Sequence, residues 1–220
     1  KMTRAWTGVH INNHNGAGGP VSFPITGNEI HAYAGGILYW LQYNQATGAT
    51  ISGNQITAET GAVANNFGVL VVSNQDAVNS TFTSNTISGH DYGVGLFNVP
   101  TSNNITLGAT NSISGSKLAG VFLTDNLNFN PIGLTNFLAG GPGAASTVNI
   151  TGLSITGNLN TGVKVEGTTN TQTLNMTGAS IGGGVTGLLV TGAPTALTGN
   201  TLNNTAFSGQ SDSYITLASS

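Results

Sequence analysis

Apolar and polar residues alternate in short runs along the whole chain, and these runs recur at regular intervals. The most frequent motif is a glycine followed by an apolar residue, any residue and a second apolar residue. Its copies begin at Gly8, Gly36, Gly68, Gly93, Gly120, Gly162 and Gly187, and residues 214–217 form a last copy without the glycine. An alternation of period two is typical of β-strands that bury one face. Each copy therefore predicts a short strand.

A second motif falls between the copies of the first: an apolar residue, Ser or Thr, Gly, Asn, any residue and an apolar residue. It is clearest at residues 25–30 and 51–56, is recognisable at 82–87 and 197–202, and has looser copies that end at Ile113, Ile155 and Ile181. The two motifs alternate with a repeat of about 26 residues, a length typical of solenoid proteins. Gly and Asn separate the strands where turns need a positive φ.

The constant register of the two motifs predicts a right-handed, single-stranded parallel β-helix of about eight coils. In such a fold, like residues of successive coils stack in columns about 4.8 Å apart, and the core exists only in the stack. Hairpins of a sandwich do not keep one motif in one register, and no helical period is present. The two predicted inward columns are Val9, Ile37, Val69, Val94, Val121, Val163, Leu188 and Ile215, and Ile11, Tyr39, Val71, Leu96, Leu123, Val165, Val190 and Leu217.

Within one coil, the pair ISGNQI at residues 51–56 and GVLVV at residues 68–72 resembles the repeat of pectate-lyase-like and NosD-like parallel β-helix proteins. The resemblance covers nearly the whole chain outside residues 125–147, and it is a signature of the fold rather than of one activity. The family that it implies includes polysaccharide lyases and hydrolases, phage tailspikes, autotransporter passengers and large surface adhesins. Such relatives imply a secreted or cell-surface location and a carbohydrate or cell-surface partner.

Composition narrows the choice of partner and environment. Charged residues make up 5% of the 220 residues and the net charge is −3, so no basic field favours nucleic acid. The 38% of hydrophobic residues argues against disorder. Without cysteine the chain has neither a disulfide framework nor a thiolate metal site, and no apolar run is long enough to predict a membrane span. We expect a single β-helix domain over residues 1–220 that binds no cofactor.

The outward positions of the Gly-motif strands predict an apolar patch on the outside of the solenoid. Its residues are Leu38, Trp40, Leu70, Val72, Phe97 and Phe122. An exposed patch of this kind normally marks an interface or a covered surface. An insertion at about residues 125–147 interrupts the repeat and is rich in large apolar residues. We expect it to fold back over the patch towards coils two to four. The alternative is that the insertion or the bare patch docks on another subunit.

A column of asparagines is predicted at the turn within the second motif. It comprises Asn28, Asn54, Asn85 and Asn200, which we expect to form a structural amide ladder. Thr-rich stretches such as residues 168–173 resemble the flat Thr arrays of ice-binding solenoids, which repeat coil after coil, but no such column recurs in this sequence. The sequence therefore does not favour an ice-binding face.

Acid–base cleavage of a polysaccharide needs paired carboxylates, or a carboxylate cluster that holds Ca²⁺ beside an Arg or Lys base. No two of the seven acidic residues fall at the same register of adjacent coils in the outward columns. The most site-like group is His90 and Asp91, with Asp125 one coil along; a solvated or turn-capping pair is the alternative. An ordinary surface ion pair accounts for Lys164 and Glu166.

The other chemistry-bearing residues give no ligand set. His10, His14 and His31 show no spacing that predicts a metal site, and we interpret them as surface residues. Aromatic residues that could stack on sugar rings are Tyr39, Trp40, Tyr43 and Tyr92, although Tyr39 is expected to point inward. A carbohydrate-active enzyme of the lyase or hydrolase type, or a carbohydrate-binding module, is therefore the alternative function.

The lack of a clear reaction centre and the apolar outer face favour a non-enzymatic role. We expect a structural or adhesive solenoid of a secreted or cell-surface protein. Both ends of the chain enter or leave a coil without a visible cap, whereas solenoids need capped ends to stay soluble. The expected partners are therefore neighbouring domains of a longer chain or further copies stacked end to end into a fibre, with polysaccharide as another candidate.

Overall fold

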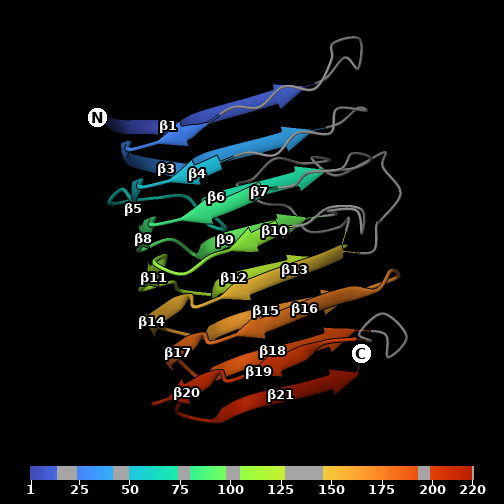
Figure 1. Ribbon diagram of the computed structural model, residues 1–220. Helices are drawn as coiled ribbons and strands as arrows, with labels where there is room; N and C mark the ends of the chain where they lie inside the picture. Colours follow the sequence, from blue (N-terminus) through green and yellow to red (C-terminus); the bar gives the residue numbers. More distant parts are fainter. Residues whose placement is uncertain are drawn as a thin grey trace.

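The computed structural model describes residues 1–13, 24–41, 50–73, 80–97, 105–126, 146–192 and 199–219. These residues form short strands joined by turns, and none of them forms a helix. The strands coil and stack turn upon turn, with the N-terminal and C-terminal turns at opposite ends of the stack (Figure 1). The prediction of an all-β parallel solenoid is confirmed. The right-handed sense of the coil stays a prediction.

The described strands form three walls. Wall 1 is a seven-stranded sheet of β2 (Ile25–Thr26), β4 (Thr50–Ser52), β7 (Ser80–Thr83), β10 (Ile105–Leu107), β13 (Ser146–Thr151), β16 (Gln172–Thr177) and β19 (Thr201–Asn203). Wall 2 contains β5 (Gln55–Ala58), β8 (Thr86–Ser88), β11 (Ser112–Ser114), β14 (Ser154–Asn158), β17 (Ser180–Gly183) and β20 (Ala206–Ser208). Wall 3 contains β6 (Phe67–Ser73), β9 (Tyr92–Phe97), β12 (Ala119–Thr124), β15 (Thr161–Gly167), β18 (Thr186–Gly192) and β21 (Ser213–Ser219). The long strands β1 (Met2–Asn13) and β3 (Glu29–Leu41) run through walls 2 and 3.

The structure has about six full turns, slightly fewer than the eight coils predicted. Among the described residues, wall 3 holds eight stacked strands, one for each copy of the Gly motif. Six of them have a neighbour on both sides, and β1 and β21 form the two ends of the stack. The predicted number of coils is higher because it counts every copy of the Gly motif, including the two copies in the terminal strands β1 and β21.

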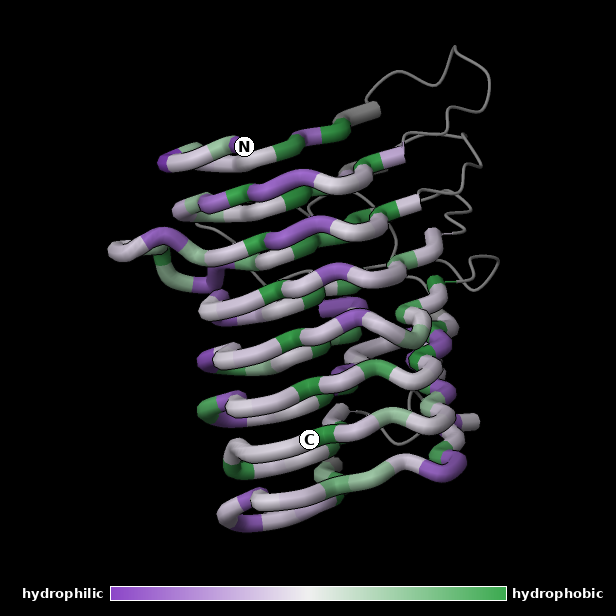
Figure 2. Tube along the Cα trace, turned by 60° about the vertical axis from the view of Figure 1, so that its left-hand side comes forward, coloured by the Kyte–Doolittle hydropathy of each residue, from purple (hydrophilic) through white to green (hydrophobic). Residues whose placement is uncertain are grey.

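The two predicted inward columns form the core of the solenoid. Their residues pair in parallel register, as Ile37 does with Val69. In the six inner turns every member of the two columns is between 0% and 5% exposed, whereas Ile215 and Leu217 of the last turn are 44% and 76% exposed. Hydrophobic stretches recur along the successive turns (Figure 2). A column residue therefore owes its burial to the turns above and below it, as expected for a solenoid.

The glycine of the first motif is required where two turns touch. A Cβ on Gly36 would overlap the Cγ2 atom of Ile56 and lie 2.5 Å from the carbonyl oxygen of Gly68. Each motif glycine from Gly8 to Gly187 faces the apolar residue that closes the second motif in the next turn. The two motifs are thus the two halves of one packing contact, which explains why they alternate so strictly.

The predicted amide ladder is present at the corner between walls 1 and 2, with one change of membership. Its members are Asn28, Asn54, Asn85 and Asn111. The Oδ1 atom of Asn85 accepts hydrogen bonds from the backbone N of Asn54 at 3.1 Å and from its Nδ2 at 2.9 Å. The same pair of bonds links Asn28 to Asn54 and Asn85 to Asn111. From Asn28 to Asn111, each of these turns is therefore joined to the next by side chains as well as by backbone.

Asn200, the fourth predicted member, does not belong to the ladder. Residues 197–202 match the second motif by sequence, but the structure places Leu202 in wall 1, where β19 pairs with β16. The residue of the last turn that closes the second motif is Phe207, which lies beside Ile181 in wall 2. The motif match in the sequence therefore ends one strand too early, in wall 1 instead of wall 2. Such a match is possible because the strands of wall 1 also alternate apolar and polar residues.

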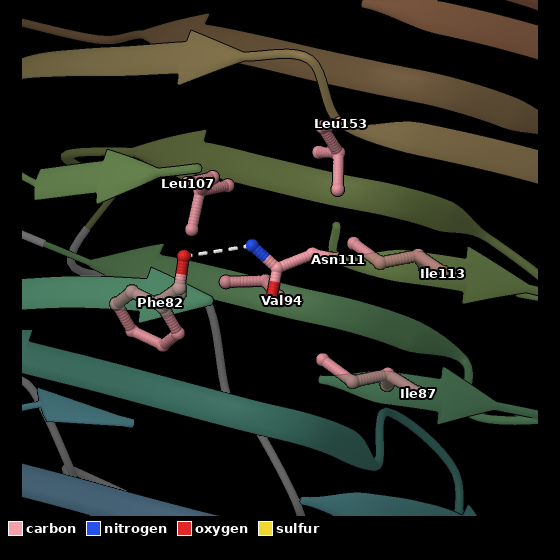
Figure 3. A pocket seen from close by; sticks show the side chains of 7 residues that line it. All are labelled: Phe82, Ile87, Val94, Leu107, Asn111, Ile113 and Leu153. Atoms are coloured by element: carbon pink, nitrogen blue, oxygen red, sulfur yellow. Dashed lines mark hydrogen bonds between the residues drawn. The ribbon is translucent and has the colours of Figure 1, made fainter. Parts of the chain in front are cut away.

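The ladder ends at Asn111, because Leu153 takes the same place in the following turn. The Nδ2 atom of Asn111 donates instead to the carbonyl oxygens of Phe82 and Gly108, both at 2.7 Å. A cavity of about 10 Å³ lies beside it, near the smallest space that holds one water (Figure 3). It is lined by Phe82, Ile87, Val94, Leu107, Asn111, Ile113 and Leu153. The amide of Asn111 is the polar side chain of this lining, and it is already hydrogen-bonded. The cavity is therefore a packing gap at the place where the ladder stops.

Candidate functional site

The predicted interface patch lies on the outer face of wall 3. Five of its six residues form one contiguous cluster and are 0–3% exposed, namely Leu38, Leu70, Val72, Phe97 and Phe122. The side chain of Trp40 and most of the predicted insertion, residues 127–145, lie outside the described residues. The outer face of these turns is therefore a second buried core rather than an exposed surface. Its role as an interface stays a prediction.

Four aromatic rings hold this outer cluster together. Phe67 stacks on Tyr92 with ring centroids 4.9 Å apart, and Tyr92 stacks on Phe122 at 5.2 Å. Phe97 meets Phe67 and Phe122 edge-on at 5.6 Å and 5.5 Å. Such contacts contribute about 0.5–1.5 kcal/mol each beyond the burial of area. Tyr92, a sugar-stacking candidate by sequence, is therefore buried between two phenylalanine rings.

Phe67 and Tyr92 belong to an outward column that counting from the glycine does not reveal. At this corner the motif glycine and the residue after it both face the core, as Gly68 and Val69 do. The residue before the glycine then faces outward, where Phe67 joins the outer cluster. An aromatic residue directly before the glycine was the available signal in the sequence.

Beyond Phe122 the outer face of wall 3 becomes charged. The Nζ atom of Lys164 lies 2.7 Å from Oε2 of Glu166 and 4.6 Å from the ring centroid of Phe122. The Oε1 atom of Glu166 accepts hydrogen bonds from Asn126 Nδ2 at 2.8 Å and from Thr124 Oγ1 at 3.4 Å. The predicted ion pair is present and half-buried, and it also fastens β15 to the turn before it.

The Tyr92 hydroxyl is held in its neutral form. Burial raises the pKa of Tyr92 to about 12, and the negative charges of Asp91 and Glu166 add to the effect. A phenol with this pKa does not lose its proton near neutral pH and is poorly matched to general-base chemistry there. Tyr92 therefore acts as a packing residue of the outer cluster.

His90 is fully buried at the corner between walls 2 and 3. Its Nδ1 atom lies 2.9 Å from Oδ1 of Asn66, which also accepts a hydrogen bond from the backbone N of Asp91 at 3.2 Å. Because that oxygen is an acceptor, Nδ1 of His90 carries the proton and donates it. Burial, together with the positive charge of Lys117, lowers the pKa of His90 to about 3. The ring is thus a neutral anchor at physiological pH.

Asp91 joins three successive turns. Its Oδ2 atom accepts a hydrogen bond from the backbone N of Asn65 at 2.7 Å in the preceding turn. Its Oδ1 atom lies 3.3 Å from Nζ of Lys117 in the following turn. This arrangement corresponds to the turn-capping interpretation of the pair rather than to an exposed reaction centre.

Asp125 is not brought together with His90 and Asp91. It follows β12, at the end of wall 3 opposite to the corner where His90 and Asp91 precede β9. Its carboxylate accepts backbone hydrogen bonds from Thr168 at 2.6 Å, Thr169 at 3.0 Å and Asn170 at 2.7 Å. The side chains of Thr168 and Asn170 donate two more, at 2.9 Å and 3.1 Å.

These five hydrogen bonds decide the protonation of Asp125. Burial by itself would raise the pKa of its carboxyl, but the donors of residues 168–170 outweigh burial and hold the pKa below its usual value. The residue is therefore an ionised anchor for the turn that follows β15.

Of the other histidines that the sequence places on the surface, His31 takes part in a network of charged side chains. His31 Nε2 lies 3.1 Å from Oε1 of Glu29, which also pairs with Lys1 Nζ at 2.8 Å. Hydrogen bonds from Lys1 and His31 lower the pKa of Glu29. His10 is exposed, and His14 lies outside the described residues. In the part of the chain that the structure describes, no group of three or more His, Asp or Glu side chains could hold a metal ion.

Wall 1 presents two outward columns of short polar residues. One contains Thr50, Thr81, Thr106, Asn149, Asn175 and Thr201, and the other contains Thr26, Ser52, Thr83, Thr151, Thr177 and Asn203. Thr occupies three successive turns of the first column, but Asn replaces it at Asn149 and Asn175, so this column is mixed rather than a Thr array. Asn175 donates to Asn149 at 3.1 Å and accepts from Thr201 at 2.8 Å. Some polar side chains of this face therefore form hydrogen bonds with side chains of neighbouring turns.

Comparison of the chain with protein-family models, with curated proteins and with solved structures finds no match. The resemblance to pectate-lyase-like and NosD-like proteins rests on the motif pair, and the structure supports its coarser part, a parallel β-solenoid. Among the described residues, the groups that sequence patterns singled out for chemistry serve mainly to join turns.

Proposed function

We propose that the chain is a structural or adhesive solenoid of a secreted or cell-surface protein. The observation that carries the proposal is that the few carboxylates of the chain mostly bind groups in other turns. Five of the six acidic residues that the structure describes bind a group in another turn; they are Glu29, Glu59, Asp91, Asp125 and Glu166. Catalytic carboxylates, by contrast, must be able to exchange protons with a substrate.

The secreted or cell-surface location is inferred from the solenoid families that the motif pair resembles. Within the described residues, no helix is long and apolar enough to cross a membrane. A polysaccharide is a candidate partner for the adhesive role, because the solenoid families of this type commonly act at carbohydrate surfaces.

The structural role is tested by replacing one inter-turn carboxylate and one that binds no other turn. Asp125→Asn keeps the size of the side chain but turns an NH₂ group towards backbone donors. We expect it to lower the free energy of unfolding by about 2–4 kcal/mol. Asp212 is exposed, so Asp212→Asn should change stability by less than about 0.5 kcal/mol. Urea unfolding followed by circular dichroism measures both.

The enzymatic alternative is tested on the unmodified chain. The purified protein is incubated with acidic and neutral polysaccharides, and new unsaturated ends and new reducing ends are measured. We expect neither. Turnover that disappears in Asp91→Asn or Glu166→Gln, with the fold intact by circular dichroism, would replace the structural proposal with a carbohydrate-active enzyme.

A further inference from the structure

The charged group on the outer face of wall 3 brings a lysine and a side-chain amide to one carboxylate. β12 and β15 are neighbouring strands of this wall, and Thr124 pairs with Glu166 (Figure 1). Nζ of Lys164 donates to Oε2 of Glu166 at 2.7 Å. Nδ2 of Asn126 donates to Oε1 of Glu166 at 2.8 Å. An amine and a carboxamide from two successive turns thus meet on the two oxygens of one carboxyl group.

Other contacts hold the members of this group in place. The backbone N of Asn126 donates to Oγ1 of Thr124 at 2.9 Å. Nζ of Lys164 lies 4.6 Å from the ring centroid of Phe122, so an aromatic ring covers one side of the amine. The side chains of Lys164 and Glu166 are 28% and 17% exposed. The amine and the carboxamide are therefore kept close together at a site that is only partly open to water.

The other lysine ion pairs that the structure describes differ from this one. Lys117 pairs with Asp91, whose other carboxylate oxygen accepts a backbone N–H. Lys1 pairs with Glu29, which also contacts an imidazole. The two lysine side chains are 50% and 60% exposed, respectively. Among these described pairs, a carboxamide and a mostly buried lysine occur together at Lys164.

We propose that Lys164 and Asn126 form an intramolecular isopeptide bond, with Glu166 as the carrier of protons. Nζ of Lys164 attacks Cγ of Asn126, a new C–N bond forms, and the bond between Cγ and Nδ2 breaks. The lysine ammonium gives up two protons, which Glu166 transfers to the departing NH₂ group. The products are a secondary amide and one ammonium ion, so the reaction needs neither an oxidant nor a co-reactant. The bond would fasten β15 covalently to the turn before it, whatever the function of the chain.

The position of Glu166 suits both proton transfers. Its carboxylate already contacts the amine that must lose a proton and the NH₂ group that must gain one. A positioned carboxyl group accelerates such steps by about 10²–10⁴-fold, and the fixed geometry adds the advantage of an intramolecular reaction. Partial burial favours the transfer from ammonium to carboxylate, because two charges are replaced by two neutral groups. One turnover in the lifetime of each chain is sufficient.

Intact mass and trypsin digestion test the bond together. The linked chain is lighter than its sequence mass by one ammonia. Trypsin cleaves after a lysine only when its amine is free. After denaturation, an unlinked chain therefore gives fragments 118–164 and 165–220, whereas the linked chain gives one fragment, 118–220. We expect this single fragment, lighter by one ammonia, from folded chain after prolonged incubation, but not from chain incubated in guanidinium chloride.

Four variants control the experiment. Lys164→Arg keeps the positive charge, Glu166→Gln removes the proton carrier and Asn126→Ala removes the carboxamide, so all three should keep the full sequence mass. Lys117→Arg changes a pair that has no carboxamide, and it should lose ammonia as the wild-type chain does. Because the bond closes residues 126–164 into a ring, the linked chain should melt roughly 10 °C above Lys164→Arg.

The wild-type chain alone decides the proposal, even where a variant fails to fold. Full sequence mass in the folded chain after incubation would overturn it. Loss of ammonia with normal cleavage after Lys164 would also overturn it, because that result places the loss at a cyclised asparagine. Neither result bears on the structural role, which the Asp125→Asn and polysaccharide experiments test.

Discussion

Asn85→Ala is the substitution that best measures how much the amide ladder contributes. The Asn85 side chain is buried and makes four hydrogen bonds with neighbouring turns. Its Oδ1 accepts two from Asn54, and its Nδ2 donates to Ile51 O at 2.7 Å and to Asn111 Oδ1 at 2.9 Å. At about 1 kcal/mol for each lost bond, with an added cost of 1–2 kcal/mol for the stranded backbone N–H of Asn54, the free energy of unfolding should fall by about 5 kcal/mol.

The matched control is Asn28→Ala, at the less buried start of the same ladder. Asn28 Nδ2 donates to Asn54 Oδ1 and to Thr26 O, but its backbone N keeps its own bond to Asn54. At the same ~1 kcal/mol for each of these two lost bonds, we expect a loss of about 2 kcal/mol. Urea unfolding followed by far-ultraviolet circular dichroism measures both variants. Equal losses for Asn85→Ala and Asn28→Ala, or a loss below about 1 kcal/mol for Asn85→Ala, would refute the view that the ladder stabilises the stack.

Three further predictions test other parts of the structure. The pKa of His90 is about 3 in the folded chain and 6.5 in the unfolded chain, so the unfolded chain alone takes up a proton as pH falls below 6.5. Between pH 7 and pH 4, the free energy of unfolding should fall by about 3 kcal/mol more in the wild-type chain than in His90→Gln. Parallel pH curves for the two proteins would contradict this. Gly36→Ala should lower the free energy of unfolding by about 1–3 kcal/mol or more, because a Cβ at this position meets Ile56. The adjacent Gly35→Ala, whose Cβ meets nothing closer than 3.9 Å, should have a melting temperature close to that of the wild-type chain. Phe97→Ala should cost about 3–5 kcal/mol in chemical unfolding, since the ring is fully buried, and a cost typical of a surface residue would show that the outer face of wall 3 is not a second core.

The fold could be predicted because both residues of its main packing contact belong to motifs that recur in every turn. The glycine of one motif and the isoleucine of the other touch, as Gly36 and Ile56 do, so both had to recur with the same period. Wall 1 has no such marker, because its strands are short and their outward residues vary among Thr, Ser and Asn. This is why Asn200 was assigned to the ladder and why the polar columns of wall 1 were not foreseen.

The candidate site could be predicted only in part, because burial and long-range partners decide its chemistry. The partners of Asp125 lie 43–45 residues further along the chain, and no local pattern connects them. The sequence indicates an apolar patch around Phe97, but its burial depends on packing across several turns. Charge spacing alone predicted the Lys164 and Glu166 pair, because both residues belong to one strand.

The central claim is that the turns stack in one register, and distances along one column test it most directly. Thr50, Thr81 and Thr201 lie in one outward column of wall 1 and are exposed. Spin labels at the cysteine pairs Thr81→Cys with Thr201→Cys and Thr50→Cys with Thr201→Cys span four and five strand steps. In samples diluted with unlabelled chain, pulsed electron resonance should give separations near 19 Å and 24 Å, about 4.8 Å for each step. Separations that do not increase with the number of turns would contradict the stacked solenoid.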